Sequence, residues 1–338
     1  MPEVSVAIPV RNGGEQFARV LLALRGQTVE HELLVCDSGS SDGSGELARE
    51  HGARVLSIRP EEFSHGATRN LLMEAAGGER VALLTQDAEP ADSSWLESLL
   101  EGFELASDVG LVYGPYRPRA DAPLPVRFEL SRWFASLSGD GTPQLERLAK
   151  DERSLPVLEL LGRRGFFSDA NACIARGAWE RVPFRVVPYA EDRVLAIDML
   201  RAGYAKAYVP SAAVLHSHTY SNVQQLRRAF DEWRGLLEIY GWREPSSPRR
   251  QVAALRGELS NARAALRSEG STGTDLVAAL LAVSRHHVLR SLGAMLGSRA
   301  DRLSTGVRRR LSLESRAGFT PLDLDRERTT PPEEASIP

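Results

Sequence analysis

The segment that most constrains the fold is the apolar run Val81–Leu84, which is followed after two residues by a lone carboxylate at Asp87. A short apolar run with no polar face is typical of a strand buried on both faces in the middle of a parallel sheet. In open α/β sheets, ligands bind just outside the carboxyl ends of the strands. Asp87 is therefore predicted to lie in a ligand crevice and to hold a cation beside a phosphate. The alternative is a plain turn over residues 87–90 that leads into a helix beginning near Ser93.

Strand and helix patterns alternate through the first part of the chain. Strands are expected at residues 4–9, 33–37, 54–58, 81–84 and 109–113, with an amphipathic helix after each of the first four. Pro9 is expected to close the first strand, because it has no N–H to donate. This alternation predicts an α/β fold with a Rossmann-like, doubly wound and mostly parallel sheet.

The later segments are less regular. Residues 116–165 are expected to form an insert with helices at 126–137 and 145–161, and residues 166–174 a returning strand. A helix is predicted from Glu191 to Ala202, and short strands at 205–209 and 213–215 should deliver His216. From residue 222 to about 313 the pattern is helical. We therefore expect a catalytic domain over 1–220, a C-terminal helical extension over 221–318 and a disordered tail over 319–338.

Charge and cysteine content restrict the partners and the compartment. The 338 residues carry 42 basic and 45 acidic side chains, so no overall field favours nucleic acid as a partner. The only cysteines, Cys36 and Cys173, lie in apolar segments and are expected to be buried thiols in a reducing compartment. The sequence begins without a charged-then-apolar leader, and its longest apolar run, 276–283, is too short to span a bilayer. We expect a cytoplasmic protein.

Three acidic positions fit one chemical site: Asp37, Asp87 and the pair Glu191–Asp192. Asp37 ends the second predicted strand, where its carboxylate can accept from a base N–H or a ribose hydroxyl. Glu191 and Asp192 begin a predicted helix, whose dipole favours the ionised form, so one of them can act as a general base. Each alone also fits an ordinary structural acid, and for the helix pair that alternative is equally good.

Taken together, five ordered segments resemble the family 2 glycosyltransferases of the GT-A fold, over residues 3 to 220. These segments are Ile8–Asn12, Val35–Ser44, Thr68–Asn70, Thr85–Asp87 and the pair Glu191–Asp192. The resemblance implies inverting transfer of a sugar from a nucleotide-sugar donor, with Asp192 as the general base and Glu191 beside it. It implies donor contacts from the following residues: Pro9, Val10, Arg11, Asp37, Gly39, Arg69, Gln86 and Asp87. Arg69 would take part of the charge of the departing diphosphate.

The metal motif departs from the family pattern, because Thr85 stands where an acid is usual. The resemblance therefore implies a divalent metal held by Asp87, His216 and the donor diphosphate. We assign His216 rather than His218, because His216 directly follows a predicted strand. One carboxylate, one imidazole and phosphate oxygens suit Mn²⁺ or Mg²⁺. The alternative for His216 is a packed histidine at a strand end.

Within the family, the chain is most similar to the bacterial rhamnosyltransferase-like branch. The segments that carry this similarity are 62–70, 84–88, 168–171, 188–192 and 216–221. It implies dTDP-L-rhamnose as donor and a glycan or lipid-linked acceptor in the cell envelope. Asp169, Asn171 and Tyr189 are expected to face the sugar or acceptor, although the first two also fit a hydrogen-bonded turn. A UDP- or GDP-sugar donor, a nucleotidyltransferase and a non-catalytic binding module are the alternatives.

The C-terminal helical region is rich in arginine. Between Arg285 and Arg316 there are eight arginines against Asp301 and Glu314, with leucine and valine interleaved. One interpretation is a solvated face packed on the catalytic domain. The other is peripheral contact with the inner face of the plasma membrane, because such a pattern suits an anionic lipid surface.

Overall fold

The computed structural model describes residues 3–162, 164–244, 247–268, 270 and 272–315, and its chain divides into two units. The first unit comprises residues 1–155 and 161–219, and the second comprises 156–160 and 220–338. The tail expected over 319–338 lies outside the described residues. Across those described ranges, no helix is both long and apolar enough to cross a membrane.

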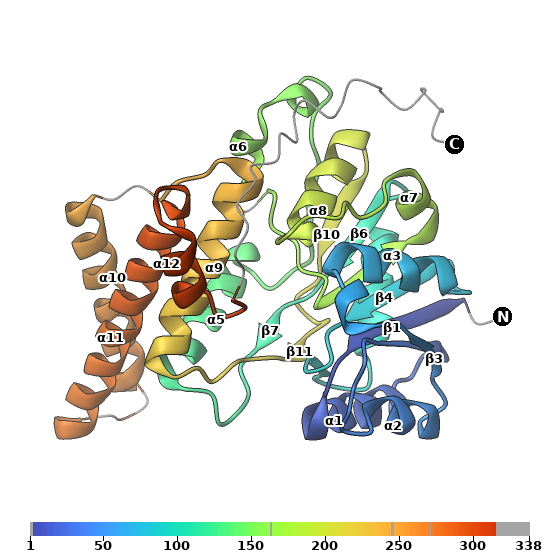
Figure 1. Cartoon of the computed structure of the whole chain (residues 1–338), viewed down its shortest axis with the longest axis horizontal. Coiled ribbons are helices and arrows are strands. Elements are labelled where there is room, and N and C mark those ends of the chain that lie inside the picture. Colours follow the sequence, from blue (N-terminus) through green and yellow to red (C-terminus); the bar gives the residue numbers. More distant parts are fainter. Residues whose placement is uncertain (1–2, 163, 245–246, 269, 271, 316–338) are drawn as a thin grey trace. The chain divides into compact units, whose positions relative to one another are not determined.

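The first unit is built on an eight-stranded sheet with the order β3-β2-β1-β4-β9-β6-β10-β8 (Figure 1). Its strands are β1 Val4–Val10, β2 Glu32–Asp37, β3 Arg54–Ser57, β4 Arg80–Leu84, β6 Val109–Tyr113, β8 Gln144–Glu146, β9 Asn171–Ala175 and β10 Ala205–Tyr208. Strands β3, β2, β1 and β4 are parallel to one another, and β6 is parallel to β10. Strand β9 runs antiparallel between β4 and β6, and β8 antiparallel to β10. The predicted α/β fold with a mostly parallel central sheet is confirmed.

Both faces of this sheet are buried, because successive side chains of a strand point to opposite faces. In β4, Ala82 and Leu84 belong to one core, whereas Val81 and Leu83 belong to the other. The first core is covered by α1 Gly14–Arg25, α2 Ser44–Glu50 and α4 Trp95–Glu101. The second is covered by α3 His65–Ala75, α5 Leu124–Leu137, α7 Arg176–Arg181 and α8 Glu191–Ala202 (Figure 1). Cys36 and Cys173 are fully buried thiols, as expected.

A second sheet of three short strands lies in the same unit, in the order β5-β11-β7. Its strands are β5 Glu89–Pro90, β7 Tyr116–Arg117 and β11 Val214–Leu215. Strand β11 pairs antiparallel with β5 and parallel with β7. The small sheet therefore gathers the chain just after β4, just after β6 and just before His216.

Two local predictions are wrong. The helix expected over 145–161 is replaced by β8, a 3₁₀ turn at Glu152–Ser154 and α6 Val157–Leu160. Glu146 and Glu152 both bind Arg164, and Pro156 interrupts any continuous helix. Pro9 does not close the first strand, which continues to Val10. This is tolerated because β4 pairs with β1 only as far as Ala7, so the missing N–H faces no strand on that side.

The second unit consists mainly of α9 Asn222–Tyr240, α10 Pro248–Ser268, α11 Gly273–Gly297 and α12 Thr305–Leu311. Helix α9 begins with a capping box, in which Ser221 and Gln224 bind each other's backbone N–H, and it ends at Gly241 with φ of 67°. Helix α11 lies close to α9 because Gly293 and Gly297 have no side chain. A Cβ at these glycines would lie 2.4 Å from the Leu226 carbonyl oxygen and 2.3 Å from that of Phe230.

Candidate functional site

The small sheet brings one carboxylate and two imidazoles together. Asp87 lies between β4 and β5, and His216 and His218 follow β11, which pairs with β5. Nδ1 of His216 is 3.5 Å from Oδ1 of Asp87, and Nδ1 of His218 is 3.7 Å from Oδ2. One donor atom from each of the three residues lies within 4.8 Å of the others. The structure places His216 beside Asp87, as expected, and brings His218 to the same carboxylate as well.

This donor set fits a divalent metal. A carboxylate with two imidazoles suits a transition metal such as Mn²⁺ better than Mg²⁺, which prefers oxygen ligands. Thr85 contributes a neutral hydroxyl, which is buried and has no hydrogen-bond partner among the described residues. Asp87 is therefore the negatively charged member of this cluster.

Arg119 hydrogen-bonds both segments that carry these ligands, the turn at Asp87 and the segment of His216 and His218. Its Nη2 donates to the main-chain oxygen of Asp87 at 2.7 Å, and its Nη1 lies 3.0 Å from Oε2 of Glu89. Its backbone N–H donates to Oγ of Ser217 at 3.1 Å, between the two histidines. One residue just after β7 thus holds both the Asp87 turn and the histidine segment.

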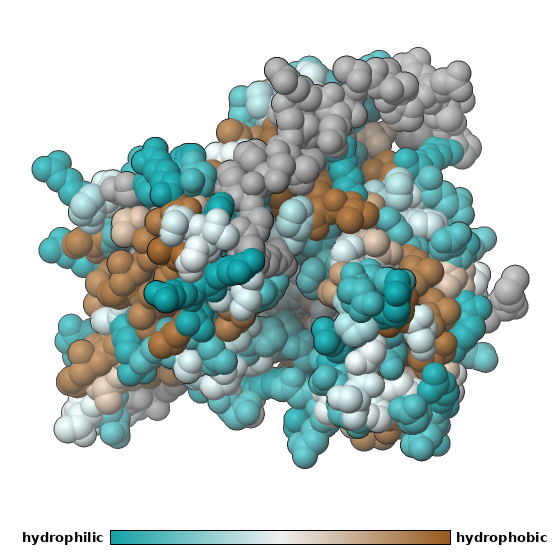
Figure 2. Space-filling view, in the orientation of Figure 1, coloured by the Kyte–Doolittle hydropathy of each residue, from teal (hydrophilic) through white to brown (hydrophobic). Residues whose placement is uncertain are grey.

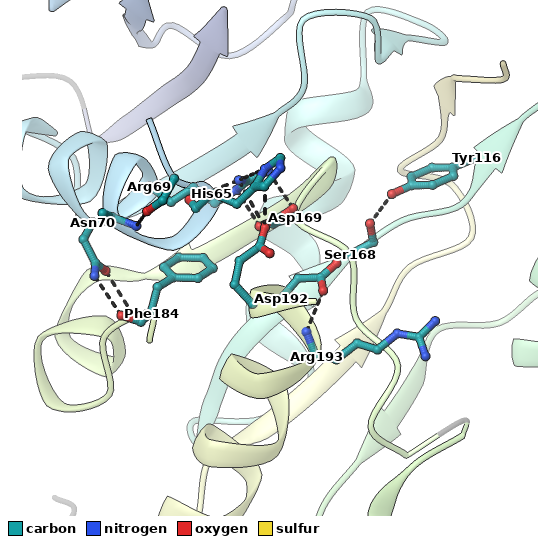
Figure 3. Close-up of polar contacts among 12 residues, drawn as sticks. His65, Arg69, Asn70, Tyr116, Ser168, Asp169, Phe184, Asp192 and Arg193 are labelled. Carbon is teal, nitrogen blue, oxygen red and sulfur yellow. Dashed lines mark hydrogen bonds and ion pairs between the residues drawn. The ribbon is translucent and has the colours of Figure 1, made fainter. Parts of the chain in front are cut away.

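A second cluster is centred on Arg69 of α3 (Figure 3). Its Nε is 2.5 Å from Oδ2 of Asp169, and its Nη1 is 3.3 Å from Oε1 of Glu191. Burial opposes the charged form of Arg69, but the two carboxylates outweigh it and raise the pKa of the guanidinium. His65 lies beside Glu191, with Nδ1 3.8 Å from Oε1. Arg69 therefore holds these two acids in place, and its expected contact with the donor diphosphate stays a prediction.

Asp192 adjoins this cluster in the first turn of α8. Its Oδ1 accepts a 2.7 Å hydrogen bond from the Arg193 N–H (Figure 3). Burial, and then the charge of Glu191, raise the pKa of Asp192 from 3.8 to about 6. Ala190, the residue before the helix, has a φ of 53°, which costs about 1–2 kcal/mol for a residue with a Cβ. This left-handed residue turns the chain so that both acids begin the helix.

Tyr116 of β7 joins the two clusters. Its ring centroid is 4.9 Å from that of His216, and its hydroxyl hydrogen-bonds Ser168, the residue before Asp169 (Figure 3). Burial is the largest of the effects that raise the pKa of Tyr116, and the charges of Asp192, Asp169 and Asp87 raise it further. The metal-binding candidates and the candidate base therefore share one site.

The residues expected to hold the nucleotide lie at the ends of β1 and β2. Asp37 ends β2, and its Oδ1 accepts the Ser40 N–H at 2.9 Å. Gly39 has a φ of 82°, and a Cβ there would lie 2.8 Å from Cγ of Pro60. The tight loop after β2 thus depends on Gly39 and on one oxygen of Asp37.

At the end of β1, the structure limits which atoms of Pro9, Val10 and Arg11 can contact a donor. The side chain of Val10 is buried and its carbonyl oxygen accepts from Ser38, so Val10 offers no side-chain contact. Gln86 holds the main chain of Arg11, with Arg11 N–H donating to Oε1 at 2.8 Å and Nε2 donating to the Arg11 oxygen at 3.3 Å. The Arg11 side chain is exposed and Pro9 is half-buried within β1.

Two residues expected in the sugar pocket are held by contacts within the protein. Asn171 is fully buried; its Oδ1 accepts from Trp95 Nε1 at 2.8 Å and its Nδ2 donates to the carbonyl oxygens of Ala212 and Pro115. Asp169 is bound by Arg69. These contacts agree with the alternative of a hydrogen-bonded turn. Tyr189 is partly exposed two residues before Glu191 and stays a candidate.

Sequence reasoning missed Tyr116, Arg119 and His218 as members of the site. Tyr116 and Arg119 follow a predicted strand at 109–113, so their position at the carboxyl edge of the sheet was an available signal. The sequence criterion of following a strand directly selects His216 over His218, although both imidazoles lie beside Asp87.

The comparisons with known proteins agree with this architecture. The family model described as "Glycosyl transferase family 2" matches residues 5–153. The O-antigen chain rhamnosyltransferase WbaN of Salmonella anatum is 31% identical over 238 residues, covering 68% of this chain and 71% of the relative. The O-antigen chain rhamnosyltransferase RfbN of Salmonella typhimurium is 32% identical over the same shares of the two chains.

Among solved structures, the chain is similar to the mannosyltransferase PcManGT of Pyrobaculum calidifontis, whose structure contains GDP-Man and Mn²⁺. The TM-score is 0.55 at 20% identity, covering 89% of this chain and 86% of that one, which supports the GT-A fold. On the strength of the two rhamnosyltransferase relatives and the family match, this chain belongs to glycosyltransferase family 2 and is a glycosyltransferase of the rhamnosyltransferase-like branch.

Proposed function

We propose that this enzyme inverts the anomeric centre as it transfers L-rhamnose from dTDP-L-rhamnose to a hydroxyl of a cell-envelope glycan or lipid-linked glycan. The choice of sugar rests on the two relatives that are named as O-antigen rhamnosyltransferases. The observation that carries the mechanism is Asp192, a helix-start carboxylate whose raised pKa of about 6 suits a base at neutral pH.

Asp192 would act in a single displacement. The acceptor oxygen forms its bond to the anomeric carbon as the bond to the nucleoside diphosphate breaks, and the hydroxyl proton passes to the Asp192 carboxylate. Because attack and departure occur on opposite faces of the sugar, the configuration inverts. Glu191, held by Arg69, keeps negative charge beside Asp192 and so strengthens it as a proton acceptor.

The cofactor we propose is Mn²⁺, held by Asp87, His216 and His218. When bound there, the ion supplies positive charge that stabilises the diphosphate leaving group. Arg119 and the pairing of β5 with β11 keep its three ligands together before the ion binds. Asp37, Gly39 and the main chain at Arg11 are proposed to hold the nucleoside.

The compartment we propose is the cytoplasm, because both cysteines are free thiols, a state compatible with reducing conditions. Lipid-linked acceptors lie at a membrane surface, so a membrane contact by the helical unit would serve this function.

Thermal unfolding with dTDP, UDP and GDP, each with and without Mn²⁺, tests the donor. Selective stabilisation by dTDP that requires Mn²⁺ is expected, because a ligand that binds only the folded state raises its stability. A preference for UDP or GDP would replace the proposed donor while leaving the fold and the base unchanged. If no nucleotide stabilises the protein, a non-catalytic module becomes the better interpretation.

A further inference from the structure

Helix α11 has an exposed apolar stripe. Its members are Val277, Leu281, Val288, Leu292 and Met295, with exposed fractions of 58%, 65%, 46%, 40% and 37%. Spacings of four, seven, four and three residues place them on one face of a helix. The stripe is about 27 Å long at 1.5 Å per residue. Isolated exposed apolar residues are ordinary, but a continuous row indicates a binding surface.

The other faces of α11 are occupied within the helical unit. Gly293 and Gly297 lie against the backbone of α9. On the side of α10, His287 lies 3.0 Å from Glu258, and Ser291 donates to Gln251 at 2.9 Å. Along α11 these contacts run from His287 to Ser291, whereas their partners along α10 run backwards from Glu258 to Gln251. The two helices are therefore antiparallel. The packing of the helices thus leaves the apolar stripe on the outside of this unit.

A row of arginines follows the exposed face of α10. Arg249, Arg256, Arg263 and Arg267 are all exposed and are spaced by seven, seven and four residues. The face of α10 that packs in the unit carries Gln251, Glu258, Ala262 and Leu266. Each residue turns the helix by about 100° about its axis. In the direction of rising residue number, the arginine row is rotated by about 130° about the α10 axis from this packed face.

The two rows face the same side of the unit. In the direction of rising residue number, the apolar stripe is rotated by about 85° about the α11 axis from the side that meets α10, which carries His287 and Ser291. Because the helices are antiparallel, one rotation is clockwise and the other anticlockwise when both helices are viewed from the same end. Starting from the sides on which the helices face each other, opposite rotations bring the two rows to the same side of the pair. Figure 2 shows hydrophobic surface over α10 and α11 with hydrophilic side chains beside it. The face defined by these nine residues is called the α10–α11 face below.

We propose that the α10–α11 face binds an anionic lipid surface. The apolar stripe would enter the boundary between headgroups and acyl chains, while the arginine row meets lipid phosphates. A second copy of the chain fits less well, because pairing the face with itself would bring two arginine rows together. The described acids of α10 and α11 are Glu258, which is paired with His287, and Asp275. Charge therefore favours an anionic partner.

Flotation of the full-length protein with phosphatidylcholine vesicles, with and without phosphatidylglycerol, tests this proposal. We expect binding only to the anionic vesicles and loss of binding at high salt, because salt screens exposed charges. The double variant Leu281→Gln, Val288→Gln and the double variant Arg256→Gln, Arg263→Gln should each bind several-fold more weakly. Matched controls on α1 are Leu22→Gln, at a residue 58% exposed, and the double variant Arg19→Gln, Arg25→Gln, which should bind as the unchanged protein does.

Three outcomes would overturn the proposal: equal binding to neutral vesicles, no binding to either kind, or equal losses in the α1 controls. A dimer in solution that the Leu281 and Val288 substitutions convert to monomers would show instead that the face joins two copies. Flotation requires no donor, acceptor or turnover. Its failure is therefore distinguishable from failure of the proposed rhamnosyl transfer.

Discussion

Arg69 and Asp169 meet side by side, with Nε of the guanidinium 2.5 Å from Oδ2 of the carboxylate and Nη2 2.8 Å from Oδ1. The two residues are 100 positions apart in the chain, and their side chains are 3% and 6% exposed. The pair joins α3 to the segment before β9. Through its contact with Glu191, Arg69 also fixes the first turn of α8, where Asp192 lies.

Replacing Asp169 with Asn should destabilise the fold by more than about 1 but less than about 3 kcal/mol, the lower end of the range for breaking a buried ion pair. The loss is reduced because Glu191 still compensates part of the Arg69 charge, and because burial raises the pKa of Asp169 and so disfavours its charged form. Urea unfolding measures this loss. Arg147→Gln is the control, since its pair with Asp108 is partly exposed, at 46% and 27%, and should be worth about 1 kcal/mol or less. Equal effects of the two substitutions would contradict a structural role for the buried pair.

The pH dependence of transfer should follow Asp192. The base must be ionised, so kcat/KM is expected to rise with pH through about 6 and then level. Asp192→Asn should remove turnover while nucleotide binding, followed by calorimetry, is retained. Retained transfer in this variant, or an unchanged acid limb, would exclude Asp192 as the base.

The same pKa makes a separate prediction for stability. A carboxyl whose pKa is higher in the folded state stabilises the fold most below its unfolded value of 3.8, and this contribution is lost as the pH rises through about 6. Asp192→Asn should therefore be more stable than the unchanged protein at neutral pH, where Asp192 is ionised. Below pH 3.8, where Asp192 is protonated in both states, this advantage should be absent. Urea unfolding across this range is the measurement, and a parallel pH profile for both proteins would show that Asp192 is not perturbed.

Much of the fold was predictable because its signals are local. The apolar run before Asp87, the Gly/Ser loop after Asp37 and the helix that begins at Glu191 each follow from neighbouring residues. The wrong helix over 145–161 shows the limit of such signals. Its strand β8 forms because Gln144–Glu146 pairs with β10, about 60 residues later in the chain, a contact that helical periodicity does not encode.

The site was less predictable because its geometry depends on pairs that are distant in sequence. Asn171 and Asp169 follow an apolar run in the manner of ligand-binding residues, yet their partners are Trp95 and Arg69. Burial beside these partners decides their role, and burial cannot be seen in a motif. The contribution of His218 likewise depends on the pairing of β11 with β5, which brings it to Asp87.

Mn²⁺ affinity should depend on both histidines. His218→Ala and His216→Ala should each weaken binding by at least about tenfold, as measured by electron paramagnetic resonance of free Mn²⁺ without donor. Affinity should also fall as the pH is lowered, because a protonated imidazole has no lone pair left for the metal. His51→Ala, outside this cluster, should have no effect. If His218→Ala binds Mn²⁺ as the unchanged protein does, Asp87 and His216 hold the ion without His218.

Arg119 should act as a positioning residue for the same ions. Arg119→Met removes the hydrogen bond to the Asp87 carbonyl oxygen and the contact with Glu89, so Mn²⁺ affinity should fall by about 10–100-fold. Glu89→Gln keeps the Arg119–Asp87 contact and should have a smaller effect. Thermal unfolding without metal separates a local effect from general loss of the fold. Unchanged Mn²⁺ affinity in Arg119→Met would show that the turn holds its shape without this brace.

The close approach of α11 and α9 should make Gly293 and Gly297 intolerant of any side chain. A Cβ at either position would fall on the backbone of α9, so Gly297→Ala should destabilise the helical unit by about 1–3 kcal/mol. Gly257→Ala is the matched control: its Cβ meets nothing within 4 Å, and alanine should stabilise α10 by about 0.5–1 kcal/mol. Unfolding followed by circular dichroism should give opposite signs for the two substitutions. The same sign for both would mean that α11 does not rest on α9 through these glycines, and the packing that leaves the apolar stripe of the α10–α11 face exposed would then need revision.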